Sequence, residues 1–249
     1  MTYRSFDLET TGLPSDEEGA APTGFMQIGW TDYTPGEPIG EPTAHFVNCG
    51  IKCSIEARAV HHITDRQVEG GISPSEACAQ LAGGRHEALC AHNIDHEKHY
   101  VGPGINPETD EERAWLCTYK TALRLWPEAP GHKLHELRYF LDLDSANDFD
   151  PRLCATPHLA PDDSYVGAHL LRRVLQEAEK QGIGIDRLMK WSSGPALLHT
   201  CFLKKHKGMP WSKVPTDYLD WIVNKSDIKD RDIRATARFY LRRNSSGGT

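Results

Sequence analysis

Long apolar runs are missing from the sequence, and its first residues contain no apolar stretch of signal-peptide length. The first absence argues against a membrane-spanning helix, and the second favours a protein that is not secreted. Hydrophobic residues make up 39% and charged residues 25%, which excludes disordered and collagen-like chains. With 249 residues, the chain can form one large domain, or a moderate domain with a small appendage.

Cysteines are few and irregularly placed: there are 7, an odd number, with no C-x-x-C pair. This pattern is unlike a disulfide scaffold and favours a reducing compartment, so we expect a cytoplasmic protein. Cys49 and Cys53 have the spacing of half a zinc site. No second pair at ligand spacing follows them, and small buried thiols are the commoner case.

The net charge of −7 conceals two parts of opposite sign. Residues 186–249 contain 13 Lys and Arg against 6 Asp and Glu, a net charge of +7, so the other 185 residues carry −14. A basic C-terminal part on an acidic body suggests that the first holds a polyanion and that the second uses clustered carboxylates.

Hydrophobic periodicity predicts three strands, then helices that alternate with short strands. The first strands are expected at 3–8, 25–33 and 44–47, with a turn-rich connection over 14–24. Later helices are expected at 73–81, after 93, at 119–126, 132–141 and 163–180, and later strands at 88–91 and 115–117. This order predicts an α/β fold with a mixed sheet flanked by helices.

The composition changes between about 182 and 197, which predicts a domain boundary there, followed by helices at 215–223 and 228–242. The last helix carries four arginines on one face: Arg231, Arg234, Arg238 and Arg242. This face suits a phosphate backbone, and it equally suits a solvated surface with intrahelical pairs to Asp227 and Asp230.

Three local patterns carry potential chemistry. Asp7 and Glu9 are two residues apart on a strand, so their side chains point to the same side. Two carboxylates that repel each other there suit Mg²⁺ or Mn²⁺ as a ligand pair. The alternative is a surface strand with a polar outer face. Residues 91–100 lead from a strand into a helix with acids at 95 and 97, one of which could reach the same metal site. The alternative is that these acids only stabilise the positive N-terminal end of the helix dipole. His158 precedes Asp163 by five residues at a helix start, where a histidine can accept a proton from water.

In this order, the three patterns resemble the motifs of the DEDDh group of 3′–5′ exonucleases. Residues 7–13, 91–93 onward and 158–163 match the three motifs, and 59–65 resembles the group's His-x-Ile-Thr loop. Residues 117–120 and 125–127 resemble one subgroup, whose small C-terminal module is matched by 202–210 and 217–221. Together the matches span about residues 3–243.

Two positions depart from the family pattern. His96 and Glu97 stand where the second motif has Phe-Asp, which keeps a carboxylate but lengthens it by one methylene; Asp95 is the fallback for this role. Leu203 stands where the C-terminal module has Gly, which changes the backbone conformations open to that loop.

The resemblance implies a ribonuclease H-like exonuclease fold with a small C-terminal α-rich module. The implied parts are an exonuclease domain over 1–183, a linker over 184–197, a basic nucleic-acid-binding module over 198–244 and a disordered tail over 245–249. In that module we expect Trp211 to contact nucleic acid from a loop, while Tyr218 and Trp221 pack in the core.

The resemblance also implies two Mg²⁺ or Mn²⁺ ions per active site. Asp7, Glu9 and Asp163 would hold the ion that activates water, Asp7 would bridge to the second ion, Glu97 would support the second, and His158 would be the general base. The implied substrate-binding residues are Thr10, Thr11, Gly12, Leu13, His61, Ile63, His92 and Asn93. Core packing is the alternative for Leu13 and Ile63.

These features predict an enzyme, a metal-dependent 3′–5′ exodeoxyribonuclease that removes nucleotides from DNA 3′ ends, preferably single-stranded, in DNA repair or proofreading. Its expected partners are single-stranded DNA or DNA 3′ ends, with no membrane, and relatives suggest a homodimer. An RNA 3′-end-trimming exoribonuclease of the same fold is one alternative, because nothing in the motifs reads a 2′-hydroxyl. A catalytically weak nucleic-acid-binding protein with a decayed second motif is the other.

Overall fold

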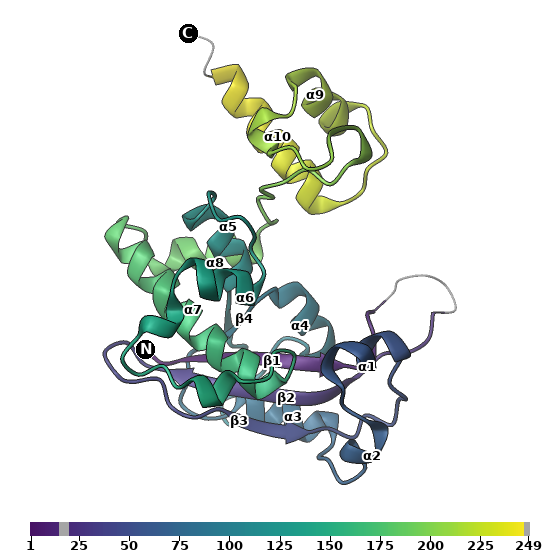
Figure 1. Ribbon diagram of the computed structural model, residues 1–249, viewed down its shortest axis with the longest axis vertical. Helices are drawn as coiled ribbons and strands as arrows, with labels where there is room; N and C mark the ends of the chain where they lie inside the picture. The colour runs from purple at the N-terminus through teal and green to yellow at the C-terminus, as the bar shows by residue number, and fades with distance from the viewer. Residues whose placement is uncertain (15–19, 247–249) are drawn as a thin grey trace.

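A five-stranded sheet with helices on both faces forms the larger part of the molecule, as described by a computed structural model of residues 1–14 and 20–246 (Figure 1). The strands are β1 (Tyr3–Thr10), β2 (Phe25–Tyr33), β3 (Thr43–Phe46), β4 (Ala88–Ala91) and β5 (Ala114–Cys117). They lie in the order β3-β2-β1-β4-β5, with β2 antiparallel to both neighbours and β1, β4 and β5 parallel. The sheet is therefore mixed, as the sequence predicts.

Ten helices surround and extend this sheet within the described residues. They are α1 (Ile55–His61), α2 (Asp65–Val68), α3 (Pro74–Ala82), α4 (Ile94–Val101), α5 (Thr118–Leu125), α6 (Leu134–Phe140), α7 (Ala160–Lys180), α8 (Ile185–Ser193), α9 (Thr216–Asn224) and α10 (Arg231–Ser246). None of these described helices is long and apolar enough to cross a membrane.

Two hydrophobic cores lie on opposite faces of the sheet. On one face Tyr3 packs with residues of α5, α7 and α8, and on the other Phe6 and Leu8 pack with residues of α3 and α4. Because neighbouring residues of a strand point to opposite faces, Asp7 and Glu9 share the face that α7 covers. The alternation in β1 thus aims both acids toward the start of α7.

A glycine in β2 lets the start of α7 approach the sheet closely. A Cβ atom on Gly29 would lie 2.3 Å from the backbone N of Pro161 and 2.4 Å from the carbonyl carbon of Ala160, so no larger residue fits. Oε1 of Gln27, two residues earlier, accepts a hydrogen bond from the backbone N–H of Ala160 over 3.0 Å. Since Gly29 pairs with Asp7 in the sheet, β2 fixes the start of α7 beside Asp7.

Residues 184–197, expected to form a linker, instead contain α8. Leu188 on this helix is buried in the same core as α5 and α7, and Oγ of Ser192 accepts a hydrogen bond from the backbone N–H of Cys117 over 2.8 Å. The apolar residues of α8 recur at helical spacing, which gives it a face to bury. Only the few residues after α8 connect the two parts of the chain.

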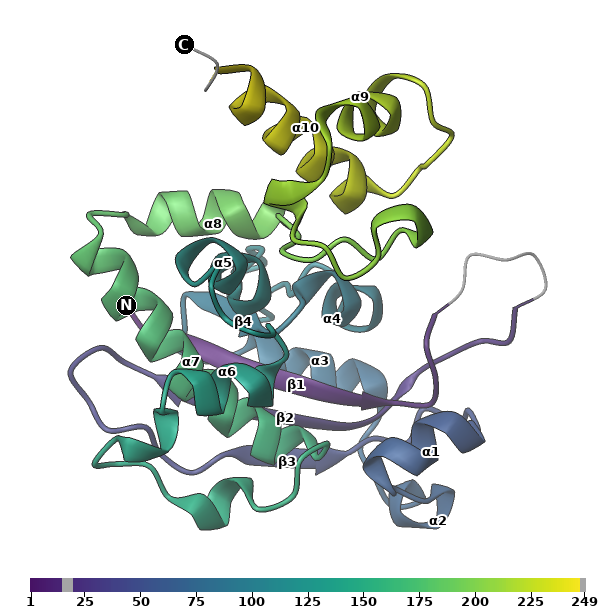
Figure 2. The same cartoon turned by 45° about the horizontal axis from the view of Figure 1, so that its top comes forward.

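Residues 197–241 contribute to a third hydrophobic core, separate from the sheet. Figure 2 shows α9 and α10 together at one end of the molecule, beyond α8. Trp211, expected to contact nucleic acid, is instead 0% exposed in this core, because the short 3-10 turn Trp211–Lys213 packs against α9 and α10. Residues 245 and 246 of the expected disordered tail extend α10. Residues 247–249 lie outside the described residues, as do 15–19 of the turn-rich connection.

Candidate active site

Three carboxylates meet where β1 ends and α7 begins. Asp7 and Glu9 come from β1, and Asp163 comes from the first turn of α7. One carboxylate oxygen from each of them lies within 4.8 Å of the others. An all-oxygen donor set of this kind suits a hard divalent cation such as Mg²⁺ or Mn²⁺.

Burial and mutual repulsion disfavour the ionised forms of these acids. Burial raises the pKa of Asp7 well above its usual range, and the charges of Glu97, Asp163 and Glu9 raise it further. Burial and the charge of Asp163 likewise raise the pKa of Glu9 to about 8. A bound cation would remove this repulsion, so the electrostatics of the cluster fit the metal that its donor atoms suit.

A fourth carboxylate, Glu97 on α4, faces the same cluster. Its side chain is 4% exposed, and its Oε2 atom is buried without a hydrogen-bond partner among the described residues. Burial, together with the charge of Glu9, raises the pKa of Glu97. Asp95 instead points outward, where it accepts a hydrogen bond from Nζ of Lys120 over 2.6 Å. The structure therefore favours Glu97 over Asp95 in the second motif.

His158 lies at the surface beside Asp163. Its backbone N–H donates a hydrogen bond to Oδ2 of Asp163 over 3.3 Å, and its φ of 64° places it in the left-handed region. The imidazole is exposed, next to an acid of the cluster. The exposed side chain of His158 has room to turn toward a bound substrate or water without a movement of the backbone.

Asp163 has a second histidine contact, which the sequence did not indicate. Nε2 of His135 on α6 donates a hydrogen bond to Oδ1 of Asp163 over 2.8 Å. This contact joins positions 28 residues apart, and His135 matched none of the motifs. No local pattern could have indicated it, because it depends on how α6 packs against α7.

The turn after β1 is held by several hydrogen bonds. Oγ1 of Thr11 accepts a hydrogen bond from the backbone N–H of Gly24, and the hydroxyl of Tyr100 on α4 donates to the carbonyl of Gly12 over 2.8 Å. Thr10 donates from its hydroxyl to the same carbonyl. Leu13 is 80% exposed, which excludes core packing as its role and leaves it free to contact a ligand.

The expected His-x-Ile-Thr loop contacts this turn from the other side. Nε2 of His61 donates a hydrogen bond to the carbonyl oxygen of Thr10 over 3.1 Å, which stabilises the turn. Ile63, expected beside the substrate, is 2% exposed and packs against Met26 and Val68. The structure thus corrects this expectation in favour of core packing, and the backbone N–H of Ile63 donates a hydrogen bond to Nδ1 of His61 over 3.0 Å.

His92 and Asn93 lie beside a groove next to the carboxylates. This active-site groove is lined by residues of both parts of the chain: His92, Asn93, Tyr119, Leu123, Pro130, Gly131, His132, Lys133, Leu134, Glu136, His158, Leu198, His199, Thr200, Phe202 and Asp232. Burial lowers the pKa of His92 to about 4, so its ring is neutral at physiological pH. Both ring nitrogens have partners, the hydroxyl of Thr118 and the carbonyl of His132, which hold the ring in place.

Comparison with known proteins extends these observations along the whole chain. No family model matches the sequence. Exodeoxyribonuclease 10 of Escherichia coli K12 is 27% identical over 241 residues, which cover 96% of this chain and 98% of the relative. The same protein from Escherichia coli O6:H1 matches to the same extent.

Solved structures share the fold. Exonuclease X in complex with 5′ overhanging duplex DNA matches with a TM-score of 0.57 and 24% identity, over 77% of this chain and 99% of that one. The nuclease domain of 3′hExo, a DEDDh family member bound to rAMP, matches with a TM-score of 0.52 and 16% identity, over 71% and 92%. These matches confirm the predicted fold class. Along nearly its whole length this chain is therefore similar in sequence to exodeoxyribonuclease 10, and in fold it resembles exonuclease X and the DEDDh-type 3′–5′ exonucleases.

Proposed function

We propose that this chain hydrolyses DNA from its 3′ end, preferring single strands, with two Mg²⁺ or Mn²⁺ ions in each active site. The observation that carries the proposal is the meeting of Asp7, Glu9 and Asp163 within 4.8 Å, with Glu97 buried against them. The sequence relative supports DNA as the substrate because it is an exodeoxyribonuclease that covers 96% of the chain. We propose a role in DNA repair or proofreading for this activity.

Each acid has a distinct task in this proposal. Asp7, Glu9 and Asp163 would hold one cation, Asp7 would also contact the second, and the longer arm of Glu97 would support the second. When bound, the two cations supply a nucleophile at neutral pH and neutralise the leaving 3′ oxygen. His158 accepts a proton from the attacking water, since it is exposed in a loop next to Asp163.

The remaining candidate residues hold the terminal nucleotide. Leu13 offers an exposed apolar side chain for the base, while Thr10, Thr11 and Gly12 form the turn beside it, which His61 supports. His92 and Asn93 line the active-site groove, along which the rest of the strand would lie. We propose residues 198–244 as a module that holds this upstream strand, because residues 186–249 carry a net charge of +7.

The test is a gel time course with 5′-labelled single-stranded DNA and matched RNA, in Mg²⁺, in Mn²⁺ and in EDTA. Asp7→Ala and Asp163→Ala serve as controls that remove one metal ligand each. We expect a ladder that shortens from the 3′ end, requires the metal, is faster on DNA and disappears in both variants. Retained activity in either variant would overturn the assignment of the site.

Two other outcomes would select the alternatives. A ladder on RNA alone would indicate an exoribonuclease of the same fold. No ladder, together with a salt-sensitive shift of DNA in a gel, would indicate a binding protein in which Glu97 does not replace the shorter acid. Sedimentation of the full chain would show whether it forms a homodimer.

A further inference from the structure

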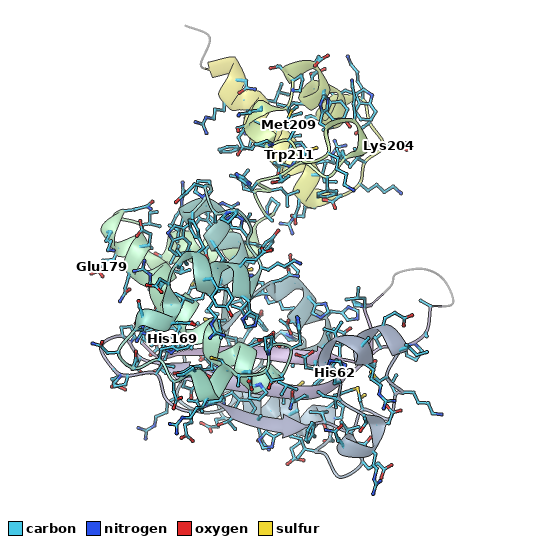
Figure 3. The ribbon with its side chains drawn as sticks, viewed as in Figure 1. His62, His169, Glu179, Lys204, Met209 and Trp211 are labelled. Carbon is cyan, nitrogen blue, oxygen red and sulfur yellow. The ribbon has the colours of Figure 1, made fainter. Side chains whose placement is uncertain are left out.

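A second groove lies on the C-terminal part, away from the carboxylates. This C-terminal groove is lined on one side by Leu203, Lys204 and Lys205 and on the other by residues of α9 and the segment after it, which include Tyr218, Trp221, Lys225 and Ile228. Lys204 lies on the outside of this part of the chain, whereas Trp211 lies inside it (Figure 3). The groove therefore presents basic and aromatic side chains together at the surface.

Two aromatic rings in this groove are stacked on one another; Tyr218 is half-buried against the core, and Trp221 is exposed to solvent. Tyr218 and Trp221 are three residues apart on α9, with ring centroids 5.4 Å apart and planes inclined by 15°. Trp221 is 40% exposed, whereas Leu219 and Ile222 on the same helix are fully buried in the core. Other residues thus fill the third core, and Trp221 is not part of it.

Cations flank the stacked rings. Nζ of Lys205 lies 5.0 Å from the centroid of Tyr218, and Lys225 follows Trp221 by one helical turn with its side chain 68% exposed. Asp217 and Asp220 are the acids nearest to the rings in sequence, and Asp220 lies 3.6 Å from Lys225. Three lysines line the groove against one aspartate, which suits a polyanion.

One short segment of the chain contributes to both grooves. Phe202 lines the active-site groove, and the next three residues, 203–205, line the C-terminal groove. A strand whose 3′ end lies at the carboxylates and which passes Phe202 would come to the segment that also lines the C-terminal groove, where Trp221 lies. Phe202 is itself 53% exposed, so aromatic surface is present along this path.

We propose that Trp221 and Tyr218 form a platform on which bases of single-stranded DNA stack, upstream of the 3′ end, while Lys204, Lys205 and Lys225 contact its phosphates. This inference rests on the proposed function, because it assigns the upstream strand of the same substrate to a site. Every base has a flat face, so stacking on Trp221 holds the strand without reading its sequence. The lysines add an attraction that weakens as salt increases.

The test measures binding of a fluorescein-labelled 25-residue oligothymidylate by anisotropy. The full chain carries Asp7→Asn to prevent degradation. Trp221→Ala should raise the dissociation constant roughly 5- to 100-fold, the range for losing one stacked base. Trp221→Phe should retain most of the affinity, since it keeps an aromatic face. Phe239→Ala is the matched control, because Phe239 is 44% exposed on α10, outside both grooves, and should bind as the parent does.

Salt dependence separates stacking from charge. Trp221→Ala should weaken binding without changing the slope of log affinity against log salt, whereas Lys225→Gln should reduce that slope by roughly 0.7. Quenching of tryptophan fluorescence by the unlabelled oligonucleotide should decrease in Trp221→Phe, and this readout remains valid if Trp221→Ala folds poorly. Equal affinity of Trp221→Ala and Phe239→Ala, or unchanged quenching in Trp221→Phe, would overturn the platform.

Hydrolysis of a short substrate distinguishes this inference from the proposed function. With Asp7 intact, Trp221→Ala should hydrolyse a trinucleotide at the parent rate, because so short a strand does not reach α9. An equal loss of rate on the trinucleotide and the long strand would overturn the upstream placement. If neither the parent nor Trp221→Ala hydrolyses any substrate, the proposed function fails. The anisotropy and quenching results then still show whether Trp221 and Tyr218 form a stacking platform.

Discussion

His135 and Asp163 are joined by a hydrogen bond of 2.8 Å, from Nε2 of the ring to Oδ1 of the carboxylate. The other oxygen of Asp163 accepts the backbone N–H of His158, so one metal-ligand candidate is oriented through both of its oxygens. Partners of this kind hold a ligand in position and tune its affinity for a metal. His135 is therefore a positioning residue for Asp163 rather than a group that touches the substrate.

His135→Ala should weaken Mg²⁺ binding roughly 10- to 100-fold, the usual effect of removing such a partner. Because the acids themselves remain, high Mg²⁺ should restore most of kcat. Activity titrated against Mg²⁺ measures both quantities. His62→Asn is the matched control, since it removes an exposed histidine and asparagine tolerates its φ of 60°. A loss that excess metal does not reverse would contradict a positioning role.

Glu97 and Asp95 should respond differently to the same conservative change. Glu97→Gln should lower kcat by roughly 100-fold or more, because charge stabilisation at the leaving oxygen is lost. Asp95→Asn should leave kcat near the parent value. It should instead lower the melting temperature by a few degrees, since Lys120, whose side chain is 2% exposed, loses its ion-pair partner. The reverse pattern would assign Asp95 to the second motif.

The stability of the metal-free protein should carry a contribution from Glu9 that decreases as pH rises. Burial and Asp163 raise the pKa of Glu9 to about 8 in the folded chain, whereas an unfolded glutamate titrates near about 4.3. Between these values the folded state binds more protons, so each increase in pH favours unfolding. In thermal melts in EDTA, the melting temperature should decrease less between pH 5 and pH 8 for Glu9→Gln than for the parent.

Mg²⁺ should reverse this effect, because it competes with protons for the same oxygens. The increase in melting temperature on adding Mg²⁺ should be larger at pH 8 than at pH 6, and it should nearly vanish in Glu9→Gln. An equal stabilisation at both pH values would show that protons on Glu9 do not oppose the metal.

His158→Asn should lower kcat roughly 10²- to 10⁴-fold with little change in DNA affinity, as expected when one general base is lost. Asparagine keeps the left-handed backbone that a φ of 64° requires, so the change removes the imidazole without straining the loop. Added imidazole should restore part of the rate. If kcat falls less than about threefold, another group must accept the proton.

Local patterns predicted the strands well because burial and alternation are recorded in neighbouring residues. β2 and β4 have the predicted bounds, and β1 extends two residues further, to Thr10. The same alternation placed Asp7 and Glu9 on one face, and the motif order placed Asp163 at a helix start near them. Such features depend on spacing alone.

What the sequence could not predict depends on packing between distant elements. Trp211 and Trp221 are both close to lysines in the sequence, yet one is buried and the other exposed, because the tertiary fold covers the turn that begins at Trp211 and leaves one face of α9 open. The outward direction of Asp95 depends on the position of Lys120, and the contact of His135 with Asp163 depends on the packing of α6 against α7. Helix α8 was expected to be a linker for the same reason, because it is stabilised by packing against the distant helices α5 and α7.

The close approach of β2 to α7 restricts how the carboxylate cluster can vary. Any side chain at Gly29 would collide with the backbone of Pro161 and Ala160, so the first turn of α7 would have to move outward and take Asp163 with it. The spacing between the acids is therefore set by a residue that bears no functional group. A position without a functional side chain thus limits how far apart the three carboxylates can lie.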